Sequence, residues 1–229
     1  DHRDLHSFPT RRSSDLRPVI LLHGGLSTSK EIETTETFKE LSNDHYVVAF
    51  EYLPPELRKE CMAPFGDIKN YSSSLKQGVD GIIQETGAKK VNIVSHSMGG
   101  LVARWYIEKL GGTDNIGKLV MIGTPNHGLS PANLFNGSDD MAGSQMAPNS
   151  KFLKELNSQS PTLKVPYYIL ASDDYWTLDD DTFFANGDGL ITFSSAKLPY
   201  GKLIRIHSKH WDQINDFNVI NTVKSCLIR

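Results

Sequence analysis

The chain has 229 residues, a length that suits a single globular domain. Its hydrophobic fraction of 38% and charged fraction of 22% are ordinary for a globular protein, and no apolar run is long enough to predict a transmembrane segment. The formal net charge of −3, without a basic stripe, argues against nucleic acid as a partner. Two cysteines, Cys61 and Cys226, lack metal-ligand spacing and leave the redox compartment open.

Residues 1–16 show no apolar period and no helix or strand pattern. They resemble translated adaptor sequence, so we expect a non-native or disordered tail that takes no part in the fold. The natural N-terminus, with any signal peptide, is then expected to be missing. Localisation therefore stays open between secreted and cytoplasmic, and residues 17–229 are expected to form one domain.

Short apolar runs alternate with helical stretches from residue 17 onward. The runs are residues 19–22, 46–50, 91–94, 119–122, 167–170 and 203–206. Helices are expected over residues 72–86, 98–110 and 212–226, because their apolar residues recur at helical spacing. This alternation predicts an α/β fold with a mostly parallel central sheet and helices on both faces.

One stretch, residues 125–161, breaks the alternation between the fourth and fifth runs. It is rich in Asn, Ser, Gly and Met, and residues 150–156 are typical of a short helix. A connection this long inside a compact domain is usually functional or mobile. We expect it to form a small cap or lid over an active site.

The most informative segment is residues 95–100, Ser-His-Ser-Met-Gly-Gly, where the third run ends and a helix is expected to begin. A serine in such a sharp turn is exposed above the sheet, and the helix N-terminus favours negative charge. The turn requires small residues two before and two after the serine, here Ser95 and Gly99. This is a G-x-S-x-G nucleophile elbow with serine in place of the first glycine, so we predict that Ser97 is a nucleophile.

Acyl transfer by a serine needs N–H donors for the oxyanion that develops. One donor is expected from the residue after the nucleophile, Met98. The other is expected from the His-Gly-Gly turn that follows the first run, at Gly25 with Leu26 as the alternative. His23, in the same turn, is interpreted as a packing or hydrogen-bonding residue.

The base is expected on a loop after the last run, because α/β-hydrolases carry their catalytic residues in the order Ser, acid, His. Two histidines qualify. His207 directly continues the run and is expected to point into the fold. His210 stands just before the final expected helix, and we favour it as the base.

The acid must orient the imidazole and stabilise its charged form. Asp188 is flanked by glycines and followed by apolar residues, which suits a carboxylate presented by a loop, and we favour it. Asp173 and Asp174, which follow a run closely, are the main alternatives, and residues 179–181 are also acidic.

These segments together resemble the bacterial true lipases of the α/β-hydrolase superfamily, meaning the Pseudomonas/Burkholderia group and, more distantly, the small Bacillus lipases. The similar segments are residues 19–25, 95–100, 122–128, 188–190 and 210–215. The resemblance implies an esterase or lipase and supports Asp188 and His210. The chain is shorter than that group and its cap is small, so strong interfacial activation and long-chain triglycerides are not expected.

The resemblance also implies a structural calcium near the catalytic histidine. In the Pseudomonas/Burkholderia group the Asp two residues after that histidine is a ligand, and Asp212 matches it. Asp216 falls where a further oxygen ligand is expected, and an acid from residues 173–181 could complete the site. The alternative interpretation of these acidic residues is solvated loops, because hard cations need several converging oxygens.

The sequence thus predicts a carboxylic ester hydrolase that uses Ser97, His210 and Asp188 and requires no cofactor. Its expected partner is a small-molecule or lipid ester, with lipid-interface contact through the cap. An acyltransferase or peptidase with the same triad is the first alternative. A non-catalytic binding protein with the hydrolase fold is the second, and it is disfavoured because every catalytic element has a candidate.

Overall fold

The computed structural model describes residues 17–58, 65–130, 138–158, 164–179 and 183–228. Its core is a six-stranded parallel sheet in the order β2-β1-β3-β4-β5-β8. The strands are β1 (Val19–Leu22), β2 (Val47–Phe50), β3 (Val91–His96), β4 (Ile116–Ile122), β5 (Tyr167–Ser172) and β8 (Lys202–Ile206). The predicted α/β class and all six predicted strands are confirmed, whereas the expected tail at residues 1–16 lies outside the described part.

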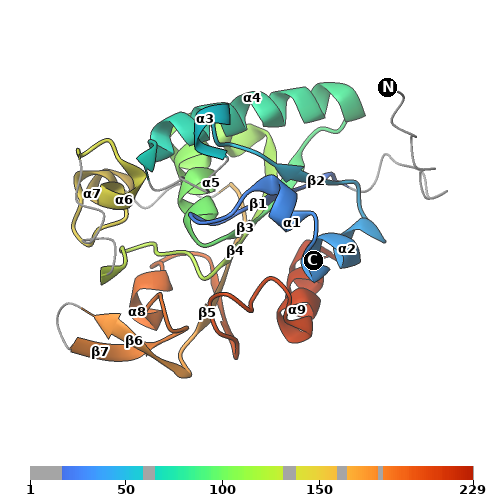
Figure 1. Cartoon of the computed structure of the whole chain (residues 1–229). Coiled ribbons are helices and arrows are strands. Elements are labelled where there is room, and N and C mark those ends of the chain that lie inside the picture. Colours follow the sequence, from blue (N-terminus) through green and yellow to red (C-terminus); the bar gives the residue numbers. More distant parts are fainter. Residues whose placement is uncertain (1–16, 59–64, 131–137, 159–163, 180–182, 229) are drawn as a thin grey trace.

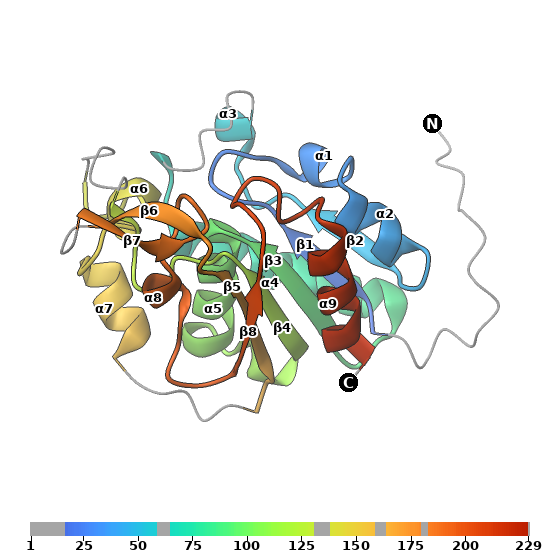
Figure 2. The ribbon, with the colours of Figure 1, turned by 90° about the horizontal axis from the view of Figure 1, so that it is seen from below.

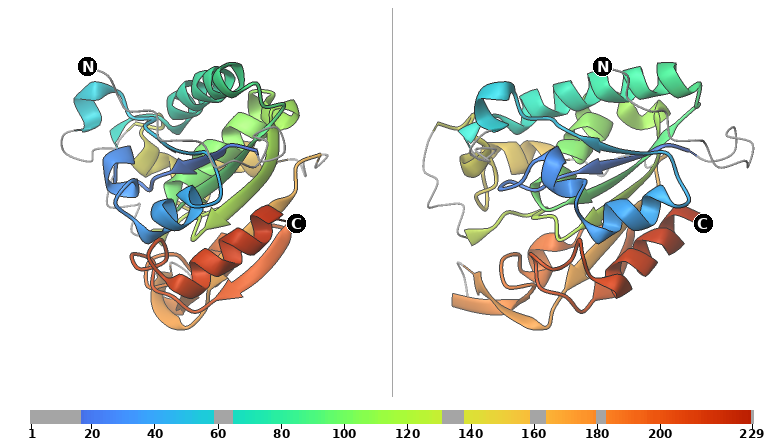
Figure 3. Two further views of the ribbon diagram at one scale, coloured as in Figure 1. Left: turned by 90° about the vertical axis from the view of Figure 1, so that its right-hand side faces the viewer. Right: turned by 45° about the vertical axis from the view of Figure 1, so that its right-hand side comes forward.

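Helices cover both faces of the sheet (Figure 1). The longer ones are α2 (Glu36–Ser42), α4 (Ile68–Thr86), α5 (Met98–Lys109), α7 (Lys151–Asn157) and α9 (Phe217–Ile228). The short ones are α1 (Ser29–Ile32), α3 (Pro55–Arg58), α6 (Ala142–Gln145), α8 (Phe193–Ala196) and a 3-10 turn at Gly112–Asp114. Figure 3 shows α4 and α5 on one side of the sheet, with α2 and α9 on the other.

Each strand of the sheet centre is buried on both faces, which explains why the strands appear as continuous apolar runs. In β1, Ile20 and Leu22 join the core under α4 and α5, whereas Val19 and Leu21 join the core under α2 and α9. All six strands are parallel, so their carboxyl ends share one edge of the sheet. In open α/β sheets, the residues that follow this edge are the ones placed to form a site.

The boundaries of two helices differ from the prediction. The last helix begins at Phe217 rather than at residue 212, because the Asp216 carboxylate accepts the N–H groups of Asn218 and Val219 and so caps it there. Residues 210–215 form turns instead. Helix α4 begins at Ile68, four residues earlier than predicted, because Asp67 caps it through the Lys69 N–H at 2.8 Å.

A two-stranded hairpin between β5 and α8 was not predicted. It pairs β6 (Tyr175–Asp179) antiparallel to β7 (Phe183–Gly187). Figure 2 shows it at one end of the molecule, and β7 contacts α8. Trp176, Leu178 and Phe184 on this hairpin are exposed, so no buried stripe marked these strands in the sequence.

The described part of residues 125–161 packs against the domain. Phe152 of α7 stacks on Trp105 of α5, with ring centroids 5.0 Å apart, and Leu156 is fully buried. The predicted helix at residues 150–156 is therefore present as α7. A lid function for this segment stays a prediction. No helix in the described ranges is long and apolar enough to cross a bilayer.

Candidate active site

Ser97 stands between the last residue of β3 and the first residue of α5. Its backbone has φ 53° and ψ −127°, a conformation with positive φ that is uncommon outside glycine. The Ser97 N–H donates to the carbonyl of Ile122 on the neighbouring strand at 2.9 Å, which helps to hold the turn. This geometry presents the side chain at the carboxyl edge of the sheet, as a nucleophile elbow does.

The small residues around Ser97 are required by close contacts with the segments that follow β1 and β4. A Cβ on Gly99 would lie 2.5 Å from the carbonyl oxygen of His23, and a Cβ on Gly100 would lie 2.0 Å from Thr124 Oγ1. Ser95 is buried, and its hydroxyl donates to the carbonyl of Val120 at 3.2 Å. Larger side chains at these positions would push α5 away from the strands beside it.

His210 follows β8 and is buried against Ser97. Its Nε2 lies 3.0 Å from Ser97 Oγ, and its Nδ1 lies 2.8 Å from Asp188 Oδ2. An ionised carboxylate only accepts hydrogen bonds, so Nδ1 carries the proton and Nε2 is free to accept from the serine hydroxyl. The His210 N–H also donates to the Asp188 carbonyl at 2.9 Å, which ties the two loops together.

The Asp188 carboxylate is buried and accepts four hydrogen bonds. Oδ1 accepts the N–H groups of Leu190 at 3.0 Å and Ile191 at 2.7 Å, while Oδ2 accepts His210 and Gln213. Burial alone would raise the pKa of Asp188, but the hydrogen bond and charge of His210 and the two backbone donors outweigh it and lower the pKa. The carboxylate is therefore ionised and able to stabilise an imidazolium.

The alternative base His207 and the acids Asp173 and Asp174 have other partners, and residues 180 and 181 lie outside the described part of the chain. His207 is an exposed residue whose Nδ1 contacts Asp174 at 2.5 Å, and Asp173 pairs with Arg205 at 2.9 Å. The structure thus brings Ser97, His210 and Asp188 into one hydrogen-bonded chain and places His207 and Asp174 in a separate surface pair.

Two buried side chains, which were not predicted as site residues, support the hydrogen-bonded series of Ser97, His210 and Asp188. Gln213 is fully buried, and its Nε2 donates to Asp188 Oδ2 at 3.0 Å. His96 donates from Nε2 to the carbonyl of His210 at 3.0 Å, and the two rings pack 4.7 Å apart. Burial and the charge of His210 lower the pKa of His96 to about 3, so its ring is neutral. Their positions beside the predicted base and nucleophile are the only sequence signal for either.

Gly123, directly after β4, lies against the side chains of His210 and Asp188. Its φ is +57°, and a Cβ there would meet Gln213 Oε1 at 2.4 Å, Asp188 Oδ2 at 3.0 Å and His210 Nδ1 at 3.1 Å. A side chain at this position would displace the acid and the base. This contact accounts for the glycine in segment 122–128, one of the segments that resemble bacterial lipases.

The segments that carry the expected oxyanion donors lie beside Ser97. Met98 is the first residue of α5, at the helix N-terminus. The turn that carries Gly25 lies against Ser97, since a Cβ on the neighbouring Gly24 would be 3.2 Å from Ser97 Cβ. Leu26, the alternative donor, has a side chain that is 55% exposed. The geometry places both segments beside the serine, and the donor roles stay predictions.

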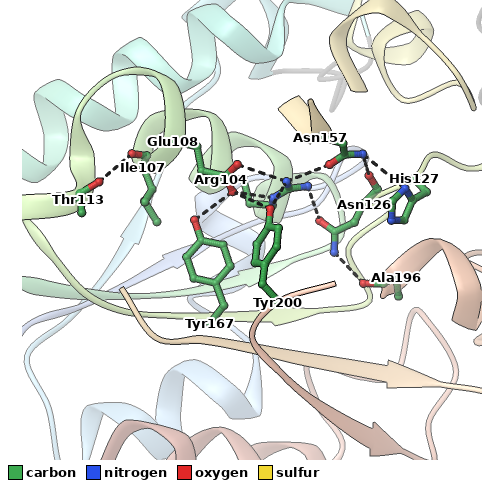
Figure 4. Close-up of polar contacts among 10 residues, drawn as sticks. All are labelled: Arg104, Ile107, Glu108, Thr113, Asn126, His127, Asn157, Tyr167, Ala196 and Tyr200. Carbon is green, nitrogen blue, oxygen red and sulfur yellow. Dashed lines mark hydrogen bonds and ion pairs between the residues drawn. The ribbon is translucent and has the colours of Figure 1, made fainter. Parts of the chain in front are cut away.

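A second polar cluster surrounds Arg104, further along α5 (Figure 4). The buried guanidinium donates from Nε to Glu108 Oε1 at 3.0 Å and from Nη1 to Asn126 Oδ1 at 3.1 Å. Its Nη2 donates to Asn157 Oδ1 at 3.0 Å and to the Tyr200 hydroxyl at 2.7 Å. This cluster ties α5 to the loop after β4, to the end of α7 and to the segment before β8.

The calcium ligands predicted from the resemblance do not converge. Asp216 serves as the cap of α9, and Asp212 is exposed. Within the described ranges, no group of three or more His, Cys, Asp or Glu side chains is placed to hold a metal ion. Residues 180 and 181, which belong to the acids expected to complete the site, lie outside the described residues, and calcium binding stays a prediction that no step of the mechanism needs.

Comparison with known structures places the fold among lipases. The mature form of Bacillus licheniformis lipase BlEst2 superposes with a TM-score of 0.72 at 19% identity, covering 96% of each chain. Its propeptide form gives a TM-score of 0.71 at 19% identity, and the match covers 93% of this chain but only 50% of that longer one. A protein of Listeria innocua gives a TM-score of 0.65 at 16% identity, covering 93% of this chain and 94% of that one.

The sequence itself assigns the family. The profile described as Lipase (class 2) matches residues 16–203, which contain Ser97 and Asp188 and end before His210. The predicted kinship with bacterial lipases is confirmed at this level, whereas the finer likeness to the Pseudomonas/Burkholderia group stays a prediction. The chain belongs to the class 2 lipase family.

Proposed function

We propose that this protein hydrolyses carboxylic esters through Ser97 as nucleophile, His210 as general base and Asp188 as the acid that orients it. The observation that carries the proposal is the chain of hydrogen bonds from Ser97 Oγ to His210 Nε2, at 3.0 Å, and from His210 Nδ1 to Asp188 Oδ2, at 2.8 Å. Membership of the class 2 lipase family supports it.

The reaction follows in two halves. His210 Nε2 takes the proton of Ser97 as Oγ bonds to the ester carbon, and the carbonyl electrons move onto oxygen. The N–H groups of Gly25 and Met98 stabilise this oxyanion. Its collapse breaks the bond to the alcohol oxygen, to which His210 passes the proton. Water then attacks the acyl-enzyme in the same manner, releasing the acid and restoring the serine.

The ester is proposed to have an apolar acyl or alcohol part. Trp211 is 60% exposed, and its ring packs edge-on against the His210 ring with centroids 5.2 Å apart, so an apolar side chain stands beside the base. Leu26, which follows Gly25 in the sequence, is 55% exposed. Leu190, whose N–H donates to Asp188, lines a cleft of about 330 Å³. The cleft is otherwise lined by residues 127–130, 148, 149, 178, 179, 192, 194 and 195.

Contact with aggregated esters is proposed through the β6–β7 hairpin. Trp176 is 76% exposed, and the directly paired residues Leu178 and Phe184 are 47% and 46% exposed. These three lie on one face of the hairpin, whereas the large exposed apolar side chains among the described residues include none from the cap. Replacing Trp176 and Phe184 with Ser should weaken binding to tributyrin emulsion and leave hydrolysis of a dissolved ester unchanged.

The test of the proposed reaction is hydrolysis of p-nitrophenyl butyrate and p-nitrophenyl palmitate by the wild type and by Ser97→Ala. We expect hydrolysis of the short ester to require Ser97, and a fluorophosphonate probe to label the wild type alone. Equal rates in the two proteins would contradict the assignment. Labelling without hydrolysis would favour an acyltransferase or peptidase, which added acyl acceptors or peptide substrates would reveal.

A further inference from the structure

A hydrogen-bonded pair, His23 and Glu51, lies behind the turn that carries Gly25. His23 is fully buried, with Nε2 at 3.0 Å from Glu51 Oε1 and Nδ1 at 2.9 Å from the carbonyl oxygen of Gly24. Both of these oxygens accept hydrogen bonds, and each faces one ring nitrogen of His23. The His23 ring thus links the Glu51 carboxylate to the Gly24 carbonyl.

Glu51 fastens both ends of this turn. Its Oε1 accepts from His23 at the start of the turn and from the Leu53 N–H at 2.9 Å. Its Oε2 accepts the N–H of Ser29, where α1 begins, at 3.1 Å and the Ser29 hydroxyl at 3.2 Å. Burial would raise the pKa of Glu51, but these donors and the charge of His23 lower it to about 2. One ionised carboxylate thus holds both His23 and Ser29.

Tyr52 adds a second support to the same turn. Its hydroxyl lies 2.8 Å from the carbonyl oxygen of His23 and 3.3 Å from that of Gly24, and its ring stacks on the His23 ring at 3.9 Å. Burial, with Tyr71 and Glu51 nearby, holds the pKa of Tyr52 well above its ordinary value. The hydroxyl therefore keeps its proton and donates it to this carbonyl pair.

The orientation of the Gly24 carbonyl determines where the Gly25 N–H points. The two groups belong to one trans peptide unit, in which C=O and N–H point in opposite directions. The carbonyl is drawn toward His23 and Tyr52, so the N–H is directed to the other side of the turn. Ser97 lies against this turn, with its Cβ 3.2 Å from where a Cβ on Gly24 would stand.

We propose that Glu51, His23 and Tyr52 are positioning residues that hold the Gly24–Gly25 peptide so that the Gly25 N–H can donate to the oxyanion. This inference rests on the proposed ester hydrolysis at Ser97. A glycine pair has no side chain to resist rotation of its peptide unit, and a donor that is already oriented stabilises the transition state without reorganisation. The carboxylate acts through the histidine and touches no substrate.

The test compares Glu51→Gln with the wild type on p-nitrophenyl butyrate. We expect kcat to fall about 100-fold, near the low end for loss of one oxyanion donor, with little change in KM. We expect the affinity for butylboronic acid to fall by a similar factor, because its tetrahedral adduct on Ser97 also places an oxygen in the oxyanion hole. Glu108→Gln is the matched control, since it removes another buried carboxylate outside this turn, and it should leave both quantities unchanged.

Several outcomes would overturn the inference. An unchanged kcat in folded Glu51→Gln would do so, and so would a lower kcat with undiminished boronate affinity, or equal losses in Glu108→Gln. If Glu51→Gln does not fold, Tyr52→Phe decides by the same two readouts, with a loss of about 10-fold expected from one hydrogen bond of about 1.4 kcal/mol. Wild-type hydrolysis that survives Ser97→Ala would instead overturn the proposed function itself.

Discussion

The chain formed by Ser97, His210 and Asp188 and the cluster around Arg104 are both buried and polar, and both include residues of α5 or of its N-terminal turn. In the Arg104 cluster, the guanidinium is enclosed by acceptors from four segments, and its charge is matched by Glu108 at 3.0 Å. In the Ser97 chain, the last member is a hydroxyl 3.0 Å from a neutral ring nitrogen, on a backbone with φ 53°.

This difference distinguishes a structural network, the Arg104 cluster, from a reactive one, formed by Ser97, His210 and Asp188. Arg104 and Glu108 gain their stability from complete pairing, and adding a proton to the pair or removing one from it would leave a buried charge without a partner. His210 has a partner that stabilises its charged form, namely the ionised Asp188, before that charge has been formed. The strained turn at Ser97 carries a conformational cost that the surrounding contacts must offset.

The largest expected effect comes from removing the Ser97 hydroxyl. Ser97→Ala should lower kcat on p-nitrophenyl butyrate by about 10⁶-fold, the loss seen when a serine protease loses its nucleophile. The fold should persist, because the Ser97 hydroxyl contributes one hydrogen bond, to His210. Steady-state kinetics and thermal unfolding measure the two expectations, and residual activity within tenfold of the wild type would refute the role of Ser97.

The next effect comes from the buried acid. Asp188→Asn should lower kcat by about 10⁴-fold, because the amide no longer favours the tautomer in which Nδ1 of His210 carries the proton. The matched change in the other network, Glu108→Gln, should leave kcat of the folded enzyme unaltered. Equal losses of activity in these two variants, measured at the same folded fraction, would erase the distinction between the networks.

Breaking the Arg104 cluster should lower stability rather than turnover. Arg104→Met removes one partner of a buried ion pair and should lower the free energy of unfolding by about 3–5 kcal/mol. Adding Glu108→Leu to the same chain should restore part of that loss, since the carboxylate is then no longer buried alone. Urea unfolding gives the free energies. A large loss of kcat in folded Arg104→Met, with little change in the free energy of unfolding, would assign this cluster to the active site.

The stability of the protein in acid should report the ionised Glu51 that holds His23 behind the turn carrying Gly25. The pKa of Glu51 is lowered from 4.5 to about 2 in the folded protein. A lowered folded-state pKa adds stability above the unfolded pKa, and that contribution disappears as the pH falls through the folded pKa. The difference in unfolding free energy between wild type and Glu51→Gln should therefore be of the order of 3 kcal/mol at pH 6 and shrink between about pH 4.5 and 2. A difference that does not change with pH would contradict the charged state of Glu51.

Much of the fold and the hydrogen-bonded chain could be read from the sequence, for a physical reason. Strands buried on both faces leave continuous apolar runs, and the elbow leaves small residues on either side of Ser97 at fixed spacing. His210 and Asp188 follow from their order along the chain and from the loops that present them. The signals for the strands and the elbow are local, because they depend on residues that are neighbours along the chain, whereas the acid and the base also needed the order of the catalytic residues and the resemblance to bacterial lipases.

The features that were missed depend on contacts between distant segments. Glu51 reaches His23 because β1 and β2 are neighbours in the sheet, and nothing within either segment marks that contact. Gln213 was expected inside a helix, and its role follows from the turns that precede α9. The β6–β7 hairpin escaped notice because its apolar side chains are exposed and acidic residues interrupt them.

The smallest expected effect tests whether the strain at Ser97 is real. Ser97→Gly removes the same hydroxyl as Ser97→Ala, but glycine accepts a φ of 53° at little cost whereas alanine does not. Both variants should be inactive, and the glycine variant should be more stable than the alanine variant by about 1 kcal/mol, the lower end of the cost of such a backbone conformation. Glycine also makes the unfolded chain more flexible, which reduces the difference, so a stability equal to or above that of the alanine variant still indicates strain. A glycine variant clearly less stable than the alanine variant would mean that the elbow holds Ser97 without cost, and the contrast with the unstrained Arg104 cluster would then rest on electrostatics alone.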